Sequence, residues 1–164
     1  SIPPPAFNVP TRRLLADSFS LMLMAVLLFC TIPVRGNAVG NQVQTFYFED
    51  GSYMTVEVIT NGARASGSKS GSKPYTYYDS DGKTLWKATL TGSFTYSGST
   101  ATCTSSRVDV TIYDSTWHTA SKSSNKSGNT ASASVTMEKR QLGITVTSKS
   151  VSMSLSCDKN GNLS

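Results

Sequence analysis

The chain has 164 residues, of which 15 are lysine or arginine and 10 are aspartate or glutamate. This length is typical of a single domain, and the lysines are scattered singly through Ser/Thr-rich sequence rather than clustered, which argues against nucleic acid as a partner. Serine and threonine make up a third of residues 39–164. The apolar side chains available for a core must therefore be concentrated on one face of each structural element.

The first element along the chain is an uncharged apolar run, LMLMAVLLFCTI, at residues 21–32. A helix needs about 20 residues to cross a bilayer, so this run is too short to do so. Arg12 and Arg13 precede it, and a short apolar run behind basic residues is typical of a secretory signal peptide. The sequence therefore predicts export, with a retained membrane anchor as the alternative.

Small residues after the apolar run indicate where cleavage is expected. Gly36 and Ala38 fit the two small-residue positions and predict cleavage after Ala38, and Val34 with Gly36 forms a second candidate site. We therefore expect an N-terminal extension and signal peptide at residues 1–38. Residues 39–164 would form a secreted domain with a net charge of +3, because three basic residues and one acidic residue precede it. No stable membrane anchor is expected after cleavage.

The secreted part alternates between apolar and polar side chains, a period of two that indicates half-buried antiparallel strands. The alternation is clearest at residues 84–96, where Trp86 and Phe94 share the apolar face. Residues 107–113 and 130–139 repeat the pattern. Each of these segments is predicted to be a strand with one face in the core.

Turn sequences separate the predicted strands. Three of them each fit a hairpin: EDGS at residues 49–52, DSDGK at 79–83 and NKSGN at 125–129. The Gly/Ser-rich stretch at residues 61–73 predicts a flexible loop. In the last strand the apolar residues change face between Val146 and Val151, which predicts a bulge near residues 148–150 or a strand that bends there between sheets.

These elements together predict an all-β fold, because strands and turns alternate without helices that would connect parallel strands. We expect an antiparallel β-sandwich of about eight strands, with a closed β-barrel as the alternative. The pattern does not determine the order of the strands.

Two cysteines, Cys103 and Cys157, lie in the predicted secreted domain. A single pair of cysteines in an exported chain predicts one disulfide bond. The chain has no CxxC motif and only one histidine, so it lacks the ligands of a zinc site. We expect neither a bound metal nor a cofactor.

The only histidine, His118, lies in the segment DSTWHT at residues 114–119. On a strand, Thr116 and His118 share a face with Cα atoms about 6.7 Å apart, whereas a nucleophile and its base need about 2.6–3.2 Å between heavy atoms. No GxSxG motif supplies another nucleophile. We therefore predict a histidine at the surface or rim, and no catalytic residue.

Three carboxylates form the basis of an enzymatic alternative. Glu57, Asp109 and Glu138 are the candidates for an acid and base acting on a glycosidic bond, which requires two carboxyl groups about 5–10 Å apart. Nothing in the sequence brings two of them together.

Two Asp/Asn-Gly clusters resemble fragments of calcium loops: Asp79 and Asp81 before a glycine, and Asp158 and Asn160 before another. A helical calcium loop also needs a glutamate twelve positions from its start, and neither stretch has one. Such clusters are common in turns, so we interpret both as turns, with calcium as the alternative.

The segment KPYTYY places Tyr75 and Tyr77 on one face of a predicted strand and Tyr78 on the other. Tyrosine offers a large apolar ring and one hydrogen-bonding tip. We therefore predict that whichever of these tyrosines is exposed contributes to a binding surface.

Residues 71–135 contain a Tyr-rich strand, a Gly turn, Leu-Trp, Gly-x-Phe-x-Tyr, a cysteine, Tyr-Asp-Ser-x-Trp and a Lys/Ser hairpin. From Gly71 to the end of the chain, including Cys157, this pattern resembles a family of small secreted two-cysteine β proteins of Gram-positive bacteria. The resemblance implies export and a two-cysteine β domain, but no particular activity.

The sequence thus favours a secreted, non-catalytic extracellular interaction or binding module whose ligand is a glycan or a protein. The first alternative is an extracellular enzyme acting on carbohydrate or cell wall. The second is a membrane-active toxin or bacteriocin.

Overall fold

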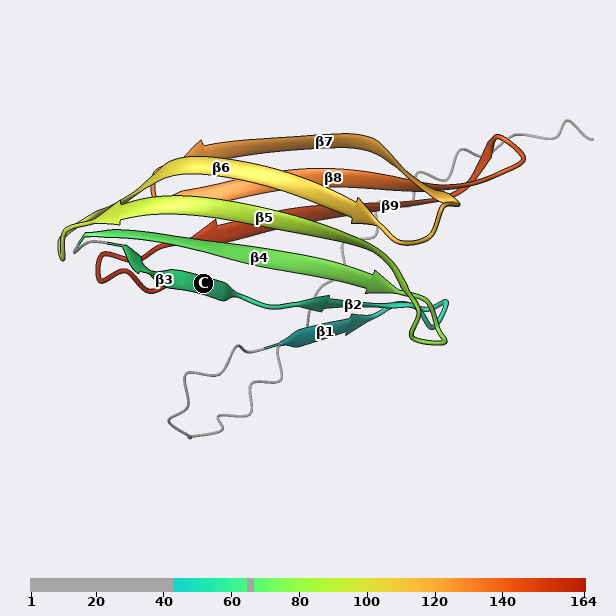
Figure 1. Ribbon diagram of the computed structural model, residues 1–164, viewed down its shortest axis with the longest axis horizontal. Coiled ribbons are helices and arrows are strands. Elements are labelled where there is room, and N and C mark those ends of the chain that lie inside the picture. Colours follow the sequence, from blue (N-terminus) through green and yellow to red (C-terminus); the bar gives the residue numbers. More distant parts are fainter. Residues whose placement is uncertain (1–42, 65–66) are drawn as a thin grey trace, which may run out of the picture. The chain divides into compact units, whose positions relative to one another are not determined.

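Alternating apolar and polar residues form nine strands in the computed structural model, which describes residues 43–64 and 67–164 (Figure 1). The predicted signal peptide at residues 1–38 lies outside the described residues, and its cleavage stays a prediction. The strands are β1 (Gln44–Tyr47), β2 (Tyr53–Val56), β3 (Ile59–Arg64), β4 (Ser68–Tyr78), β5 (Thr84–Tyr96), β6 (Ala101–Ile112), β7 (Trp117–Ser127), β8 (Thr130–Gln141) and β9 (Ile144–Ser156).

The strands form two antiparallel sheets that face each other (Figure 1). The six-stranded sheet has the order β1-β2-β4-β5-β6, with β3 also paired to β4, and the three-stranded sheet has the order β7-β8-β9. The predicted all-β, antiparallel fold is confirmed. The closed-barrel alternative is wrong, and the described residues contain nine strands rather than about eight. This part of the chain contains no helix with the length and apolar character needed to cross a membrane.

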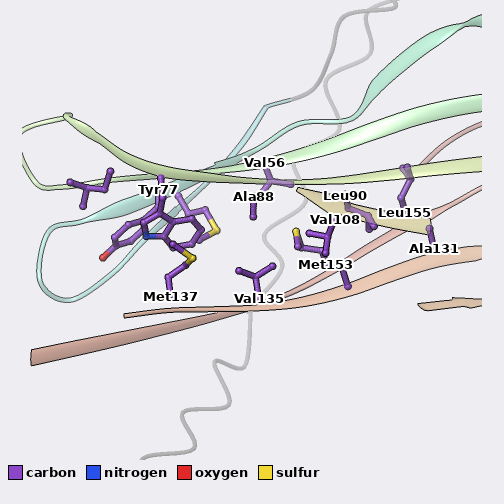
Figure 2. Packing of buried hydrophobic residues seen from close by; sticks show 14 of the residues in the cluster. Val56, Tyr77, Ala88, Leu90, Val108, Ala131, Val135, Met137, Met153 and Leu155 are labelled. Atoms are coloured by element: carbon purple, nitrogen blue, oxygen red, sulfur yellow. The ribbon is translucent and has the colours of Figure 1, made fainter. Parts of the chain in front are cut away.

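The core lies between the two sheets and takes one residue in two from each central strand (Figure 2). Leu90 of β5 is fully buried, as are Val135 of β8 and Leu155 of β9. Full burial of such a side chain contributes about 1.5–3 kcal/mol relative to exposure. The buried cluster extends from Met54 to Cys157, so residues 39–164 contain a complete core of their own.

An aromatic cluster forms one end of this core. The ring of Trp86 stacks on Tyr77 with centroids 5.1 Å apart, and Trp117 of the opposite sheet lies 6.2 Å from Trp86. Both tryptophans are buried, and neither indole N–H has a hydrogen-bond acceptor among the described residues. The cluster therefore joins the two sheets through ring packing alone.

The flexible loop predicted over residues 61–73 is wrong for residues 61–64 and 68–73. Residues 61–64 belong to β3 and residues 68–73 to β4, which pairs with β3 on one edge and β5 on the other. The loop was predicted because this stretch is rich in glycine and serine. Backbone hydrogen bonds on both edges of β4 hold the stretch in a strand despite its low apolar content. At Gly71, a Cβ would lie 2.3 Å from the Leu163 side chain and 2.9 Å from the Ile59 carbonyl oxygen, so glycine permits this close packing.

The irregularity predicted for the last strand is present but lies earlier. The register between β8 and β9 shifts where Lys139 pairs with Thr147 and Arg140 pairs with Thr145. Val146 is the extra residue in β9. The apolar residues therefore change face before residues 148–150, not within them.

Side chains of β7 close the free edge of β6. Lys126 Nζ donates to the Thr104 carbonyl oxygen at 2.6 Å, and Ser124 Oγ donates to the Ser106 carbonyl oxygen at 3.3 Å. Ser106 Oγ in turn donates to the Ser132 carbonyl oxygen of β8 at 3.2 Å. The two sheets are thus joined along this side mainly by side-chain hydrogen bonds, with a backbone bond from Cys103 to Gly128 at the end of β7, and not by a strand ladder.

Candidate binding surface

Three tyrosines are aligned on the outer face of the six-stranded sheet. Tyr47 of β1 pairs with Tyr53 of β2, and Tyr53 pairs with Tyr78 of β4. Directly paired residues of antiparallel strands point to the same face, and the adjacent Met54 and Tyr77 are buried in the core. We call Tyr47, Tyr53 and Tyr78 the tyrosine row.

Ring geometry determines which parts of the tyrosine row a ligand can reach. The rings of Tyr53 and Tyr78 are stacked, with centroids 4.7 Å apart and planes at 12°. Tyr47 lies 5.6 Å from Tyr53 at 40°. Tyr47 is 77% exposed and lies on the edge strand, so one face of its ring is open, whereas Tyr53 and Tyr78 are half-buried and each covers one ring face of the other.

A second row of polar side chains runs beside the tyrosine row. Thr45, Thr55, Thr76 and Lys87 follow one another in register across β1, β2, β4 and β5. Each threonine is two residues from a tyrosine of its own strand, which separates the two rows by about 6.7 Å. The outer face thus combines aromatic rings with hydroxyl groups and one ammonium group. The distance between the two rows is comparable to the width of a small ring-shaped ligand.

The β4–β5 turn borders the tyrosine row and fixes its edge. The Asp79 carboxylate accepts hydrogen bonds from the backbone N–H groups of Asp81 at 3.0 Å and Lys83 at 2.8 Å. Gly82 has a φ of 82°, in the region that favours glycine, and a Cβ there would lie 3.4 Å from the Tyr53 hydroxyl. The turn therefore lies against the tip of Tyr53.

The second predicted turn has the same construction. The Asp158 carboxylate accepts hydrogen bonds from the backbone N–H groups of Asn160 and Asn162, both at 2.8 Å. The Asn162 side chain donates a further bond at 2.7 Å, and these bonds lower the pKa of Asp158. Among the described residues, no group of three histidine, cysteine, aspartate or glutamate side chains is placed to hold a metal ion. Asp79 and Asp158 thus each accept hydrogen bonds within their own turns, as in the turn interpretation of both clusters.

The other two tyrosines of the KPYTYY segment face inward. Tyr77 is 2% exposed, and its hydroxyl donates to Ser52 Oγ at 2.8 Å. Tyr75 is half-buried against the core. Burial raises the pKa of Tyr75, partly offset by a hydrogen bond from the Ser154 backbone N–H. Of the three predicted binding residues, the structure places only Tyr78 on the outer face.

Cys103 of β6 and Cys157, which directly follows β9, both lie at the β7–β8 turn. The backbone N–H of Cys103 donates to the Gly128 carbonyl oxygen at 2.8 Å, and that of Cys157 donates to the Asn129 carbonyl oxygen at 3.0 Å. Both cysteines are buried and are free thiols in this structure. Burial raises the pKa of both thiols. The predicted disulfide bond is not formed here and stays a prediction.

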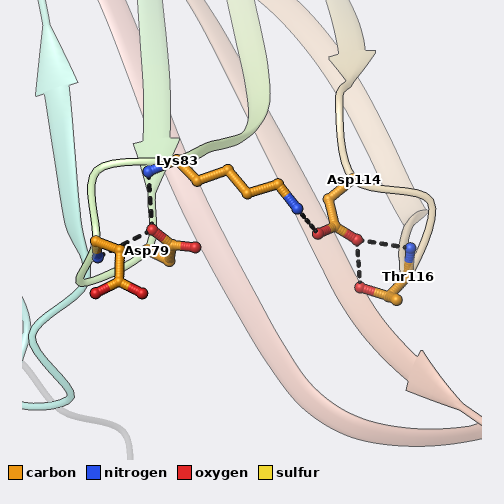
Figure 3. A network of polar contacts seen from close by, with 5 residues as sticks. Asp79, Lys83, Asp114 and Thr116 are labelled. Carbon is orange, nitrogen blue, oxygen red and sulfur yellow. Dashed lines mark hydrogen bonds and ion pairs between the residues drawn. The ribbon is translucent and has the colours of Figure 1, made fainter.

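The DSTWHT segment forms a polar turn and the start of β7, not a catalytic triad (Figure 3). Thr116 donates to Asp114 Oδ1 from its backbone N–H at 2.9 Å and from its hydroxyl at 2.7 Å. Lys83 Nζ binds Asp114 Oδ2 at 2.9 Å. His118 is exposed and pairs in register with Glu138, on the outer face of the three-stranded sheet. The Asp114 carboxylate is thus occupied by Thr116 and Lys83.

This network predicts a pH dependence of stability. Hydrogen bonds from Thr116, and then Lys83, hold the pKa of Asp114 well below its ordinary value of 3.8. A carboxyl group with a lower pKa in the folded state stabilises the fold above its unfolded pKa and loses this effect as the pH falls through the folded pKa. We expect Asp114→Asn to lower the free energy of unfolding by about 1 kcal/mol at pH 7, and by less below about pH 3. Urea denaturation at both pH values measures this, and an equal loss at both would contradict it.

The three carboxylates of the enzymatic alternative are not brought together. Asp109 of β6 lies on the outer face of the six-stranded sheet, bound to Arg107 at 2.8 Å. Glu138 lies on the outer face of the three-stranded sheet, bound to Arg140 at 3.0 Å. Glu57 follows β2 and donates its backbone N–H to the Pro74 carbonyl oxygen. It is thus about three strand spacings from Asp109, roughly 14 Å, beyond the separation that glycoside hydrolysis requires.

Comparisons of the chain with protein-family models, with curated proteins and with solved structures find no match. The resemblance to secreted two-cysteine proteins of Gram-positive bacteria therefore stays an expectation.

Sequence reasoning missed Tyr47 and Tyr53. Tyr47 pairs with Tyr53 across the β1–β2 turn, and Tyr53 pairs with Tyr78 of a strand that follows β3 in the sequence. The alternation within a single strand does not give this register.

Proposed function

We propose that this protein is a secreted, non-catalytic binding module that recognises an extracellular glycan through the tyrosine row. The observation that carries the proposal is the open ring of Tyr47, which is 77% exposed at the end of the tyrosine row and tilted against the stacked pair of Tyr53 and Tyr78. A folded protein gains little stability from a ring in this position. Exposed aromatic side chains of this kind dominate the energetics of binding surfaces.

The chemistry of a sugar fits this surface. A pyranose ring has an apolar C–H face and a rim of hydroxyl groups, so it requires an aromatic ring beside hydrogen-bonding groups. Tyr47 supplies the open ring, and Thr45 and Thr55 of the adjacent row supply hydroxyl groups. Since one ring makes the main contact, we expect weak binding to a single sugar and stronger binding to a repeating polymer that engages several copies of the protein at once.

The non-catalytic part of the proposal is supported by the separation of the carboxylates. Asp109 and Glu138 lie on opposite outer faces of the two sheets. The extracellular part is supported by the apolar run at residues 21–32 and by the Cys103–Cys157 pair.

We expect residues 39–164 to bind a subset of polysaccharides on a glycan array that includes bacterial cell-wall polymers. Tyr47→Ala should weaken binding by about 1–2 kcal/mol, because it removes the open ring. Tyr47→Phe should retain most of the binding, because it keeps the ring and loses only the hydroxyl group. Titration of each variant against the strongest ligand of the array measures the effect.

His118→Ala is the matched control, because His118 is exposed on the other sheet. It should bind as the wild-type protein does. If this variant lost glycan binding while its circular dichroism spectrum stayed unchanged, the result would favour the enzymatic alternative. Release of dye from liposomes by the wild-type protein would favour the membrane-active alternative.

A further inference from the structure

The turn between β8 and β9 carries an exposed leucine in a backbone conformation that leucine disfavours. Gln141 pairs with Ile144, which leaves Leu142 and Gly143 as a two-residue loop with φ values of 51° and 79°. These values match a type I′ turn, whose first position favours asparagine, aspartate or glycine. Leu142 is the only non-glycine residue with positive φ in the described part of the chain, and it is 102% exposed. Stability of the fold does not explain a leucine here.

Further apolar side chains adjoin Leu142. Ile144 is 68% exposed and Val146 is 49% exposed, and Figure 1 shows the end of this hairpin extending past the neighbouring β6–β7 loop. We call Leu142, Ile144 and Val146 the apolar tip. Two basic residues, Lys139 and Arg140, lie beside it on β8, and Arg140 also forms an exposed ion pair with Glu138 at 3.0 Å.

We propose that the apolar tip inserts shallowly into the headgroup region of an anionic lipid bilayer. The size of the tip favours lipid over protein, because a stable protein interface buries about 800 Å² on each partner and three side chains around a two-residue turn do not provide that area. Interfacial binding to lipid needs only a few apolar side chains with basic residues nearby. Lys139 and Arg140 would lie at the level of the lipid phosphates, where basic residues are attracted to anionic lipid.

This inference is independent of the proposed function, because it concerns the β8–β9 turn and not the tyrosine row. The test is co-sedimentation of residues 39–164 with vesicles of phosphatidylcholine and phosphatidylglycerol, and with vesicles of phosphatidylcholine alone. We expect binding to the anionic vesicles and at least tenfold weaker binding to the neutral ones.

The variant Leu142→Asn tests vesicle binding without destabilising the fold. Asparagine is favoured at this position of the turn, so the variant should be at least as stable as the wild-type protein. It should nevertheless bind anionic vesicles about tenfold more weakly, because it removes a leucine side chain from the lipid contact. Leu142→Met should bind as the wild-type protein does, because it keeps an apolar side chain at the tip.

Val43→Asn is the matched control, because it makes the same kind of change at a residue that is 57% exposed outside any strand. It should leave vesicle binding unchanged. Absence of wild-type binding to the anionic vesicles would overturn the proposal. Wild-type affinity in Leu142→Asn would also overturn it.

Discussion

Replacing Trp86 by alanine should lower the free energy of unfolding by about 4 kcal/mol. The side chain is fully buried, and its ring packs against both Tyr77 of its own sheet and Trp117 of the other, which also contact each other. Removing it leaves a cavity at the contact between the sheets, and β-sheets with paired backbones cannot collapse far to fill it. For a domain of this size, the melting temperature should fall by roughly 15 °C.

Trp86→Phe distinguishes the loss of packing from the loss of the indole N–H. That N–H has no acceptor among the described residues, so its removal eliminates a buried donor without breaking a hydrogen bond. Phenylalanine also keeps most of the ring contact with Tyr77. We expect a cost of about 1–2 kcal/mol for this variant. Urea denaturation of both variants measures the difference, and equal costs would show that ring packing does not stabilise this end of the core.

Forming the disulfide bond between Cys103 and Cys157 should raise the free energy of unfolding by about 4 kcal/mol, because it closes a loop between residues 54 positions apart. The two residues flank the same turn from opposite sheets. The bond would therefore join the sheets at the end opposite to the tryptophan cluster. Because burial raises the pKa of both thiols, few thiolates are present near neutral pH. We expect the bond to form while the chain folds rather than in the folded protein.

Mass spectrometry of protein folded under oxidising conditions should show the loss of two hydrogen atoms relative to the reduced form. A reducing agent should then lower the stability of the wild-type protein. It should not change that of Cys103→Ser, which cannot form the bond. Two titratable thiols in protein unfolded after oxidative folding would contradict the prediction.

The sequence was sufficient to predict the central strands, because Trp86, Leu90 and Phe94 alternate with polar residues in a pattern that only a half-buried strand satisfies. It was insufficient for the hairpin of β3 and β4. The residues from Ser68 to Lys73 are small or polar, and their pairing depends on neighbours that are distant in the sequence. Local composition does not report backbone pairing of this kind.

The candidate site was predicted in part for the same reason. Tyr78 was among the predicted binding residues, but Tyr75 and Tyr77 belong to the interior. The choice between the two faces of β4 depends on where the three-stranded sheet lies, and a single strand does not show this. Tyr47 belongs to the site only because β1 pairs with β2 and β2 pairs with β4.

The side-chain hydrogen bonds along β6 have a consequence for how the protein behaves at high concentration. An open strand edge is a template on which a strand of another molecule can add, and this is a common first step of fibril growth. At β6 the carbonyl groups of Thr104 and Ser106 are already bound by Lys126 and Ser124. The Lys126 ammonium group must remain hydrated, so a strand that added here would have to bury this charge. A strand of another molecule is therefore disfavoured from adding to β6 at Thr104 and Ser106.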